Sequence, residues 1–514
     1  MPTYLSPGVY VEEVEAGSRP IEGVGTAIAA FVGFAAQGPF NDPVLVTNWG
    51  QYTAVFGEFA EDSYLAHAVY GYFLNGGGNC YVVRVGGERA GGGADGGGQV
   101  SAAMPQAMLG GYRVVARELP SAGGKGGALT VEVSDATGDA AGDDRYTLVV
   151  KQNGKPVETH QVTTRRGKDN VVTVVREQSK LITVEEVPAG SGLAKGTVTL
   201  RPAAEPVPTR REVVADDYVG DVAERTGFGG LEAIDEITMV AVPDLMSAYR
   251  RNGLDLEAVK AVQLAMIAHC ELMGDRMAII DPPPGLSPQQ VKEWRADLAG
   301  YDSKYATLYY PWIKVFDPAT GTEAFIPPSG HLAGVWARND ATRGVHKAPA
   351  NEVVRGAIAL ATQVTKTEQE LLNPIGVNCI RTFPGRGVRV WGARTLSSDP
   401  AWRYLNVRRL FNYLEESILN GTQWVVFEPN DDALWARIRR TVSAFLVMEW
   451  RKGALFGLTP DEAFFVRCDR ETNPAESIDA GQVVCEIGVA PVKPAEFVIF
   501  RLAQISGGTS LVNE

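Results

Sequence analysis

The chain lacks the features that would place it in a membrane or on nucleic acid. Nowhere do about 18 apolar residues run unbroken, although 45% of the 514 residues are hydrophobic. The formal net charge is -13, whereas nucleic-acid-binding proteins concentrate Lys and Arg to displace counterions from phosphates. We therefore predict a folded multidomain protein with no nucleic-acid partner and no membrane-spanning segment.

Cysteine is scarce, and its spacing suits neither zinc nor a disulfide framework. There is no CxxC pair, and an odd number of cysteines cannot be fully paired within one chain. This pattern is typical of reduced, mostly buried thiols in a protein made in the cytoplasm. The N-terminal sequence also lacks the basic and apolar segments of a secretory signal, so we expect no Sec export. The cysteines are Cys80, Cys270, Cys379, Cys468 and Cys485.

Catalytic and nucleotide-binding motifs are missing as well. The sequence has no GxxxxGK[ST], GxSxG, HExxH or EF-hand loop, and no GxGxxG after a strand. The glycines of FPGRGVRVWGARTL have the wrong spacing for a phosphate loop and predict a turn into a strand. We expect no cofactor and no metal.

One segment, residues 328–351, concentrates histidine and charge. A hydrolytic site with a histidine as general base and Asp340 as its orienting carboxylate is chemically possible, but no nucleophile or metal set accompanies it. Because the segment is rich in Gly, Pro, Asn and Ala, we favour a loop packed against another polypeptide, with ion pairs that set register. Its charged and imidazole side chains are His331, Arg338, Asp340, Arg343 and His346.

Strand and helix patterns alternate on both sides of a glycine-rich stretch. Apolar runs at 27–35 and 80–85 flank a helical pattern at 63–74, and the alternation resumes after the stretch. This predicts an α/β middle domain, residues 21–88 plus 217–340, with helices layered on a sheet.

Two of the predicted strands of this domain end in aspartate, Asp244 and Asp281. The carboxyl ends of such strands often line a ligand crevice. Because proline adjoins both residues and no phosphate loop follows, we favour turn-forming strand exits.

Residues 89–216 have a different character. GGERAGGGADGGGQ is a flexible linker by composition, and short alternating runs follow it, including NVVTVVRE. The Asn153-Gly154 pair predicts a hairpin turn. We interpret residues 89–216 as a glycine-rich linker and an inserted all-β domain. An adhesive binding module acting through residues 112–208 is an alternative.

The last third predicts a mixed α/β C-terminal domain, residues 341–514. It contains two helical patterns, at 401–421 and 430–453, and the second opens with acidic and closes with basic residues, as a helix dipole favours. Strand patterns follow at 464–468 and 481–490.

The two ends of the chain carry strand patterns without an obvious partner. An unpaired strand is an aggregation hazard unless something completes it, so these segments suggest strand addition to neighbouring subunits. Pairing within their own domain is equally compatible with the pattern. The segments comprise Val9, Tyr10, Val11, Glu12, Glu13 and Val14, and Phe497, Val498, Ile499, Phe500, Arg501 and Leu502.

Four stretches resemble the sheath proteins of contractile phage tails and related contractile injection systems. They begin YLSPGVYVEEVEAG, PPSGHLAGVWARNDATRG, LLNPIGVNCIRTFPGRG and WVVFEPNDDALWARI. The resemblance implies a structural protein, not an enzyme, that stacks as hexameric rings, or a six-start helix, around an inner tube on a baseplate. Contraction from a metastable extended state would drive the tube through a target envelope, so a membrane is reached only indirectly.

The resemblance also assigns roles along this chain. Arms at residues 1–20 and 495–514 would exchange with neighbours and complete sheets in their C-terminal domains, while the insert would project outward. Partners would be other copies, the inner tube, the baseplate and a terminator or cap protein, with assembly in the bacterial cytoplasm. The opening sequence looks closer to injection-system sheaths than to phage tails. The candidate tube-facing helix carries Asp431, Asp432, Arg437, Arg439 and Arg440.

Overall fold

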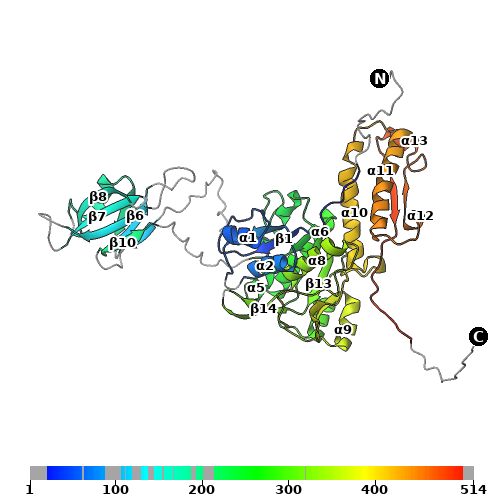
Figure 1. The fold of residues 1–514 in the computed structure, drawn as a ribbon, viewed down its shortest axis with the longest axis horizontal. Helices are drawn as coiled ribbons and strands as arrows, with labels where there is room; N and C mark the ends of the chain where they lie inside the picture. Colours follow the sequence, from blue (N-terminus) through cyan, green and yellow to red (C-terminus); the bar gives the residue numbers. More distant parts are fainter. Residues whose placement is uncertain are drawn as a thin grey trace, which may run out of the picture. The chain divides into compact units, whose positions relative to one another are not determined.

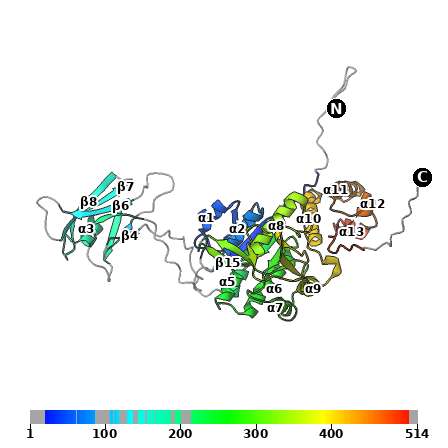
Figure 2. The same ribbon diagram turned by 60° about the horizontal axis from the view of Figure 1, so that its bottom comes forward.

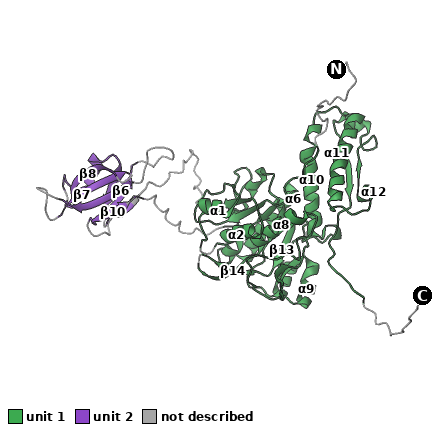
Figure 3. Ribbon diagram, viewed as in Figure 1, with its two compact units in different colours: residues 1–87, 212–514 green, residues 88–211 purple. Residues whose placement is uncertain are grey.

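The computed structural model divides the chain into two compact units (Figure 3). Unit 1 comprises residues 1–87 and 212–514, and unit 2 comprises residues 88–211. The predicted N-terminal arm lies outside the described residues, except for Pro20. The structure describes residues 20–60, 63–86, 106–109, 112–117, 129–136, 144–152, 155–165, 167–186, 193–200, 214–318 and 320–501.

Unit 1 is built on an eight-stranded sheet of order β18-β17-β13-β12-β11-β1-β3-β2 (Figure 1). Its six central strands run parallel, and the edge strands β2 and β18 are antiparallel to their neighbours. Strands covered on both faces form continuous apolar runs, as in the fully buried AAFVG of β1. The strands are β1 Ala29–Gly33, β2 Val44–Val46, β3 Cys80–Arg84, β11 Met239–Ala241, β12 Met277–Ile280, β13 Ala306–Tyr310, β17 Val377–Phe383 and β18 Gly387–Val390.

Helices cover both faces of this sheet. Figure 2 shows α1 and α2 on one side of unit 1, and α6 and α7 on the other. The helices are α1 Trp49–Phe56, α2 Leu65–Asn75, α4 Ala215–Val219, α5 Leu245–Arg250, α6 Leu256–Met273, α7 Pro288–Glu293, α8 Ser329–Arg343 and α9 Lys366–Leu372. A π-helical turn follows α7 at Trp294–Ala299, and 3-10 turns lie at Gly229–Ala233, Asn373–Ile375, Pro400–Trp402 and Gln423–Val425. A small sheet of β14 Ile313–Asp317, β15 Thr322–Ile326 and β16 Ala359–Leu360 completes this part.

The C-terminal part of unit 1 has a hydrophobic core of its own, between two long helices and a two-stranded sheet. Both helices were predicted, although the first begins four residues later than the pattern indicated. Asp431 caps the second by accepting a bond from the Leu434 N–H at 2.8 Å. The elements are α10 Leu405–Gly421, α11 Asp432–Arg451, α12 Pro460–Ala463, β19 Phe464–Arg467, α13 Ala475–Asp479 and β20 Glu486–Val489.

The predicted boundary between residues 340 and 341 needs correction. It falls inside α8, and β17 and β18, which lie beyond it, belong to the large sheet of the middle domain. Local periodicity identifies a strand but does not indicate which sheet the strand joins.

Unit 2 contains two antiparallel sheets, of order β4-β5-β9 and β10-β6-β7-β8. It is not all-β, because 171–178, predicted as a strand, forms helix α3 with Val171, Val174 and Val175 buried at helical spacing. The hairpin of β7 and β8 is present, but Asn153 and Gly154 lie outside the described residues. The elements are β4 Gln106–Leu109, β5 Tyr112–Ala116, β6 Leu129–Asp135, β7 Arg145–Gln152, β8 Lys155–Thr163, α3 Val171–Gln178, β9 Ile182–Glu186 and β10 Gly196–Thr199.

Candidate functional site

The segment predicted as a loop at residues 328–351 is largely a buried helix, α8. Its first nine residues, 329–337, are all buried. Gly330 allows α8 to pack closely against α2 because it has no side chain. A Cβ at this position would lie 2.3 Å from the Ala68 Cα. The loop prediction was wrong because close packing outweighs the low helix propensity of glycine and asparagine.

His331 and Asp340 do not come together as the hydrolytic prediction requires. Asp340 lies nine residues after His331 on α8, about 13 Å along the axis, and His346 follows the end of the helix. Burial, together with nearby His67, lowers the pKa of His331 to about 3. A neutral, enclosed imidazole this far from Asp340 cannot act with it as a general-base pair.

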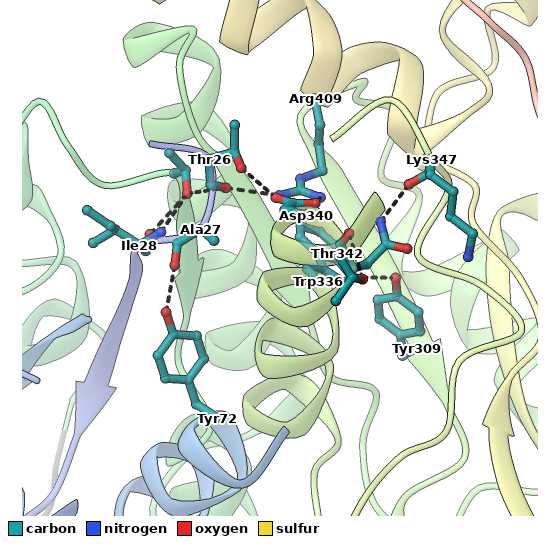
Figure 4. Close-up of polar contacts among 12 residues, drawn as sticks. Thr26, Ala27, Ile28, Tyr72, Tyr309, Trp336, Asp340, Thr342, Lys347 and Arg409 are labelled. Carbon is teal, nitrogen blue, oxygen red and sulfur yellow. Dashed lines mark hydrogen bonds and ion pairs between the residues drawn. The ribbon is translucent and has the colours of Figure 1, made fainter. Parts of the chain in front are cut away.

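Asp340 instead anchors a buried network that joins three segments (Figure 4). Its carboxylate accepts bonds from both terminal nitrogens of Arg409 on α10, at 2.6 and 3.0 Å, and from the Thr26 hydroxyl at 2.7 Å. Arg409 also donates to the Thr26 carbonyl oxygen at 2.9 Å. The network ties the chain that follows the N-terminal arm to α8 and α10.

Aromatic groups enclose this network. The Arg409 guanidinium lies 4.6 Å from the centre of the Trp336 ring, whose indole N–H donates to the Tyr309 hydroxyl at 3.0 Å. The Tyr72 hydroxyl donates to the Ala27 carbonyl oxygen at 2.6 Å. Sequence analysis missed Arg409, although an arginine four residues after Leu405, on the buried side of a helix, signals an enclosed partner.

The neighbouring arginines of α8 have different environments. Arg338 donates to the carbonyl oxygens of Asn75 at 2.8 Å and Val353 at 2.6 Å, so it braces the backbone. Arg343 is exposed in the last turn of α8. His346 uses its carbonyl oxygen to accept a bond from the Asn406 side chain at 2.7 Å.

The sheet of β19 and β20 borders an apolar groove of about 410 Å³. Among the described residues no third strand pairs with this sheet. Ile487 and Val489 of β20 line one side of the groove, opposite α10. The α10 lining comprises Phe411, Leu414, Glu415, Ile418 and Leu419.

The C-terminal segment is held at Glu496, and the described residues after it, 497–501, extend away from the rest of unit 1 (Figure 1). Glu496 accepts bonds from Arg394 at 2.7 and 2.9 Å, from Asn373 at 2.7 Å and from the Tyr404 hydroxyl at 3.2 Å. The hydrogen bonds and charge of these partners hold the pKa of Glu496 below its usual value despite partial burial.

In the described part of the C-terminal arm, the predicted strand is not formed within this subunit. Residues 497–501 have no strand pairing, and Ile499 and Phe500 are 78% and 85% exposed. Leu502 and the residues Val9 to Val14 lie outside the described part of the chain.

The charged residues of α11 mostly bind within the C-terminal part of the chain. Asp432 pairs with Arg470 at 2.8 Å, and Arg437 pairs with Glu428 at 2.7 Å. Arg439 donates to the Cys468 carbonyl oxygen, and Arg440 is exposed. Asp431 serves as the helix cap.

The two strand-end aspartates are buried structural groups. Asp244 accepts bonds from the Phe34 N–H at 2.7 Å and the Ser63 hydroxyl at 2.9 Å, and Asp281 accepts from the Ser329 N–H at 3.0 Å. Burial raises the pKa of Asp244 to about 6 and that of Asp281 to about 7. The strand-exit interpretation therefore fits better than a ligand crevice.

Among the described residues, no cluster of three or more His, Cys, Asp or Glu side chains has an arrangement that could hold a metal ion. Within the same ranges, no helix combines the length and apolarity needed to cross a membrane.

Comparison with known families identifies this arrangement. The phage tail sheath protein central domain matches residues 216–396, and the phage tail sheath C-terminal domain matches residues 397–505. The chain belongs to the tail sheath protein family. The two matches begin after the insert, so they place residues 88–211 outside the shared sheath domains.

Individual relatives match over most of the chain. The tail sheath protein of Burkholderia phage BcepMu is 26% identical over 518 residues, which cover 96% of this chain and 95% of the relative. The helical sheath of the anti-feeding prophage in its contracted state is 25% identical, with a TM-score of 0.58, covering 98% of this chain and 100% of that chain. The contracted sheath complex of PVC, an extracellular contractile injection system, shares the fold at 24% identity and a TM-score of 0.58, covering 98% and 99%.

Proposed function

We propose that this tail sheath protein is the sheath subunit of a contractile injection apparatus. It would polymerise with itself as stacked hexameric rings, or a six-start helix, around an inner tube that stands on a baseplate. The match to the contracted anti-feeding prophage sheath over 98% and 100% of the two chains supports an injection system. The match to the BcepMu sheath supports a contractile phage tail as the second candidate.

One observation carries the polymerisation proposal: a two-stranded sheet and its apolar groove occur beside an exposed apolar arm in one chain. An incoming strand would gain backbone hydrogen bonds at the sheet edge and would bury apolar side chains in the groove. Residues 497–500 have four consecutive apolar side chains and are anchored at Glu496, from which they could reach another copy. The N-terminal arm, residues 1–20, is proposed to act in the same way.

Contraction would follow from a difference in buried area between two lattices. Each extra 100 Å² of apolar surface buried per subunit contributes about 2.5 kcal/mol, so modest rearrangements repeated over many subunits supply the work. The exchanged arms would act as hinges that keep subunits connected. Calorimetry should show that the contracted sheath unfolds at a higher temperature than the extended one; the opposite order would contradict this mechanism.

The remaining partners are assigned from the resemblance to sheath proteins. We propose an inner tube protein in contact with α11, a baseplate at one end and a terminator or cap protein at the other. Assembly would occur in the bacterial cytoplasm, and the particle would stay there or be released. Membership of a family of structural proteins favours a role without catalysis or cofactors.

Electron microscopy of four chains tests polymerisation. The intact chain should form hollow helical tubes, and a chain lacking residues 1–17 should not. Ile418→Asp places a charge in the groove and should also abolish tubes, whereas Leu272→Asp changes a 74% exposed side chain on α6 and should leave them intact. Circular dichroism confirms folding of each variant. Tubes from folded Ile418→Asp protein would argue against strand addition at this groove.

A further inference from the structure

Two of the five cysteines face each other at the end of the C-terminal sheet. β19 and β20 pair antiparallel, with Val466 opposite Ile487 and Arg467 opposite Glu486. Continuing this register by one residue places Cys468 opposite Cys485. Each thiol influences the pKa of the other, which agrees with side chains that lie close together.

The position within the ladder suits a covalent bridge. The Ala490 N–H donates to the Ala463 carbonyl oxygen at 2.8 Å, so this residue pair is of the hydrogen-bonded kind. Alternation along an antiparallel ladder then puts Cys468 and Cys485 at a non-hydrogen-bonded position, and Cα atoms of such pairs are typically about 4.5 Å apart. Disulfides span Cα separations of about 4.4–6.8 Å.

Access and surroundings differ for the two thiols. Cys485 is partly exposed, whereas Cys468 is buried and its sulfur accepts a contact from the Asn473 side chain at 3.8 Å. Burial raises the pKa of both thiols, and the positive charge of Arg439, which binds the Cys468 carbonyl oxygen, offsets part of that rise. An outer thiol beside an inner one is the usual arrangement of an attacking and a resolving cysteine.

We propose that Cys468 and Cys485 form a redox-active pair that closes to an intrasubunit disulfide when the protein meets a small-molecule disulfide under oxidising conditions. The Cys485 thiolate attacks one sulfur of oxidised glutathione, forming a mixed disulfide and releasing one glutathione thiolate. The Cys468 thiolate then attacks the Cys485 sulfur and displaces the second glutathione. Two electrons pass to the oxidant, and the two thiol protons pass to solvent and to the released glutathione.

The bridge would join the end of β19 to the start of β20 and close a loop of residues 469–484. It would prevent the two strands from separating. Reducing conditions keep the thiols free, so the locked form is expected outside the cytoplasm. Because burial raises the pKa of Cys485 to about 12, closure should be slow near neutral pH and faster as the pH rises.

Thiol counting on the intact folded chain tests the proposal. Reduced protein is incubated with oxidised glutathione at about pH 8.5, the free thiols are alkylated, and the protein is then unfolded and analysed by mass spectrometry. The thiol count should fall from five to three, and a non-reduced digest should contain one peptide linking Cys468 to Cys485. The buried Cys80, Cys270 and Cys379 serve as internal controls and should stay reduced.

Two conservative variants sharpen this test. Cys485→Ser should keep its four thiols, whereas Cys468→Ser should gain a single glutathione on Cys485 because no resolving thiol remains. The proposal is overturned if the folded chain keeps all five thiols while a cysteine-containing peptide in the same tube is oxidised. It is also overturned if Cys485 links two subunits instead.

Discussion

The Arg409 guanidinium and the Asp340 carboxylate form a two-bond ion pair, 2.6 and 3.0 Å long, with only 3% and 4% of their side chains exposed. Removing one member of such a pair leaves the other charge buried without its partner. The pair joins α8 to α10, so it strengthens the link between the large sheet and the C-terminal helices.

Replacement of Asp340 by asparagine should destabilise the subunit strongly. We expect the free energy of unfolding to fall by about 3–5 kcal/mol, because the Arg409 charge would remain enclosed. Urea denaturation followed by tryptophan fluorescence measures the change. Asp432→Asn breaks the exposed pair with Arg470 and should leave the midpoint unchanged. Equal effects of the two variants would refute the structural role of Asp340.

Gly330→Ala should destabilise the protein although alanine is the better helix former. The added Cβ would press on the Ala68 backbone, and we expect a loss of about 1–3 kcal/mol from overpacking. Without that contact the same change within a helix would stabilise it by about 0.5–1 kcal/mol. Gly78→Ala, where no atom lies within 4 Å of the added Cβ, should be close to neutral. A stabilised Gly330→Ala protein would contradict the close packing of α2 and α8.

Two pairs of buried groups have opposite effects on how the stability of the subunit changes with pH near pH 5. Burial lowers the pKa of His331 to about 3 and that of His269 to about 4, so these histidines lower stability as the pH falls below 6.5. The raised pKa values of Asp281 and Asp244, about 7 and about 6, lower stability as the pH rises above about 4.

Single substitutions should separate the two opposing contributions to the change of unfolding free energy with pH. Relative to the unmodified protein, the slope of stability against pH near pH 5 should rise by about 1.4 kcal/mol per unit in Asp281→Asn, because the folded chain no longer holds the buried Asp281 proton. In His331→Gln the slope should fall by a similar amount. Urea unfolding at several pH values measures both changes, and two changes of the same sign would show that one assignment is incorrect.

Glu496→Ala should release the base of the C-terminal arm. Loss of its charged hydrogen bonds to Arg394 would cost about 1.5 kcal/mol, which corresponds to roughly tenfold faster amide exchange at the hydrogen-bonded amides of residues 492 and 496. Hydrogen exchange with mass spectrometry checks this expectation. Glu471→Gln, at an 83% exposed side chain, is the control. Unchanged exchange in Glu496→Ala would mean that the carboxylate does not hold the arm.

Sequence reasoning succeeded where the signal is local. The apolar runs of β1 and β3 and the helix α11, with its acidic start and basic end, depend on near neighbours and were predicted. α3 was missed because β-branched valines favour strands, although Asn170 caps a helix there. α8 was missed because its stability comes from α2, far away in the sequence.

The candidate sites depend on pairs that no local pattern connects. Asp340 and Arg409 are 69 residues apart, and Glu496 and Arg394 are 102 residues apart. The sequence marked Asp340 and the C-terminal arm, but it gave no indication of their partners. Cys468 and Cys485 were dismissed as distant thiols because only the strand register brings them together.

The insert leaves unit 1 after β3 and returns just before α4, so it interrupts a connection and not a strand. The two units do not share a hydrophobic core, and among the described strands none joins a sheet of the other unit. Evolution can therefore exchange, enlarge or delete the insert without changing the residues that fold unit 1. A protein engineer has the same freedom, and residues 88–211 are the place at which to graft a foreign domain.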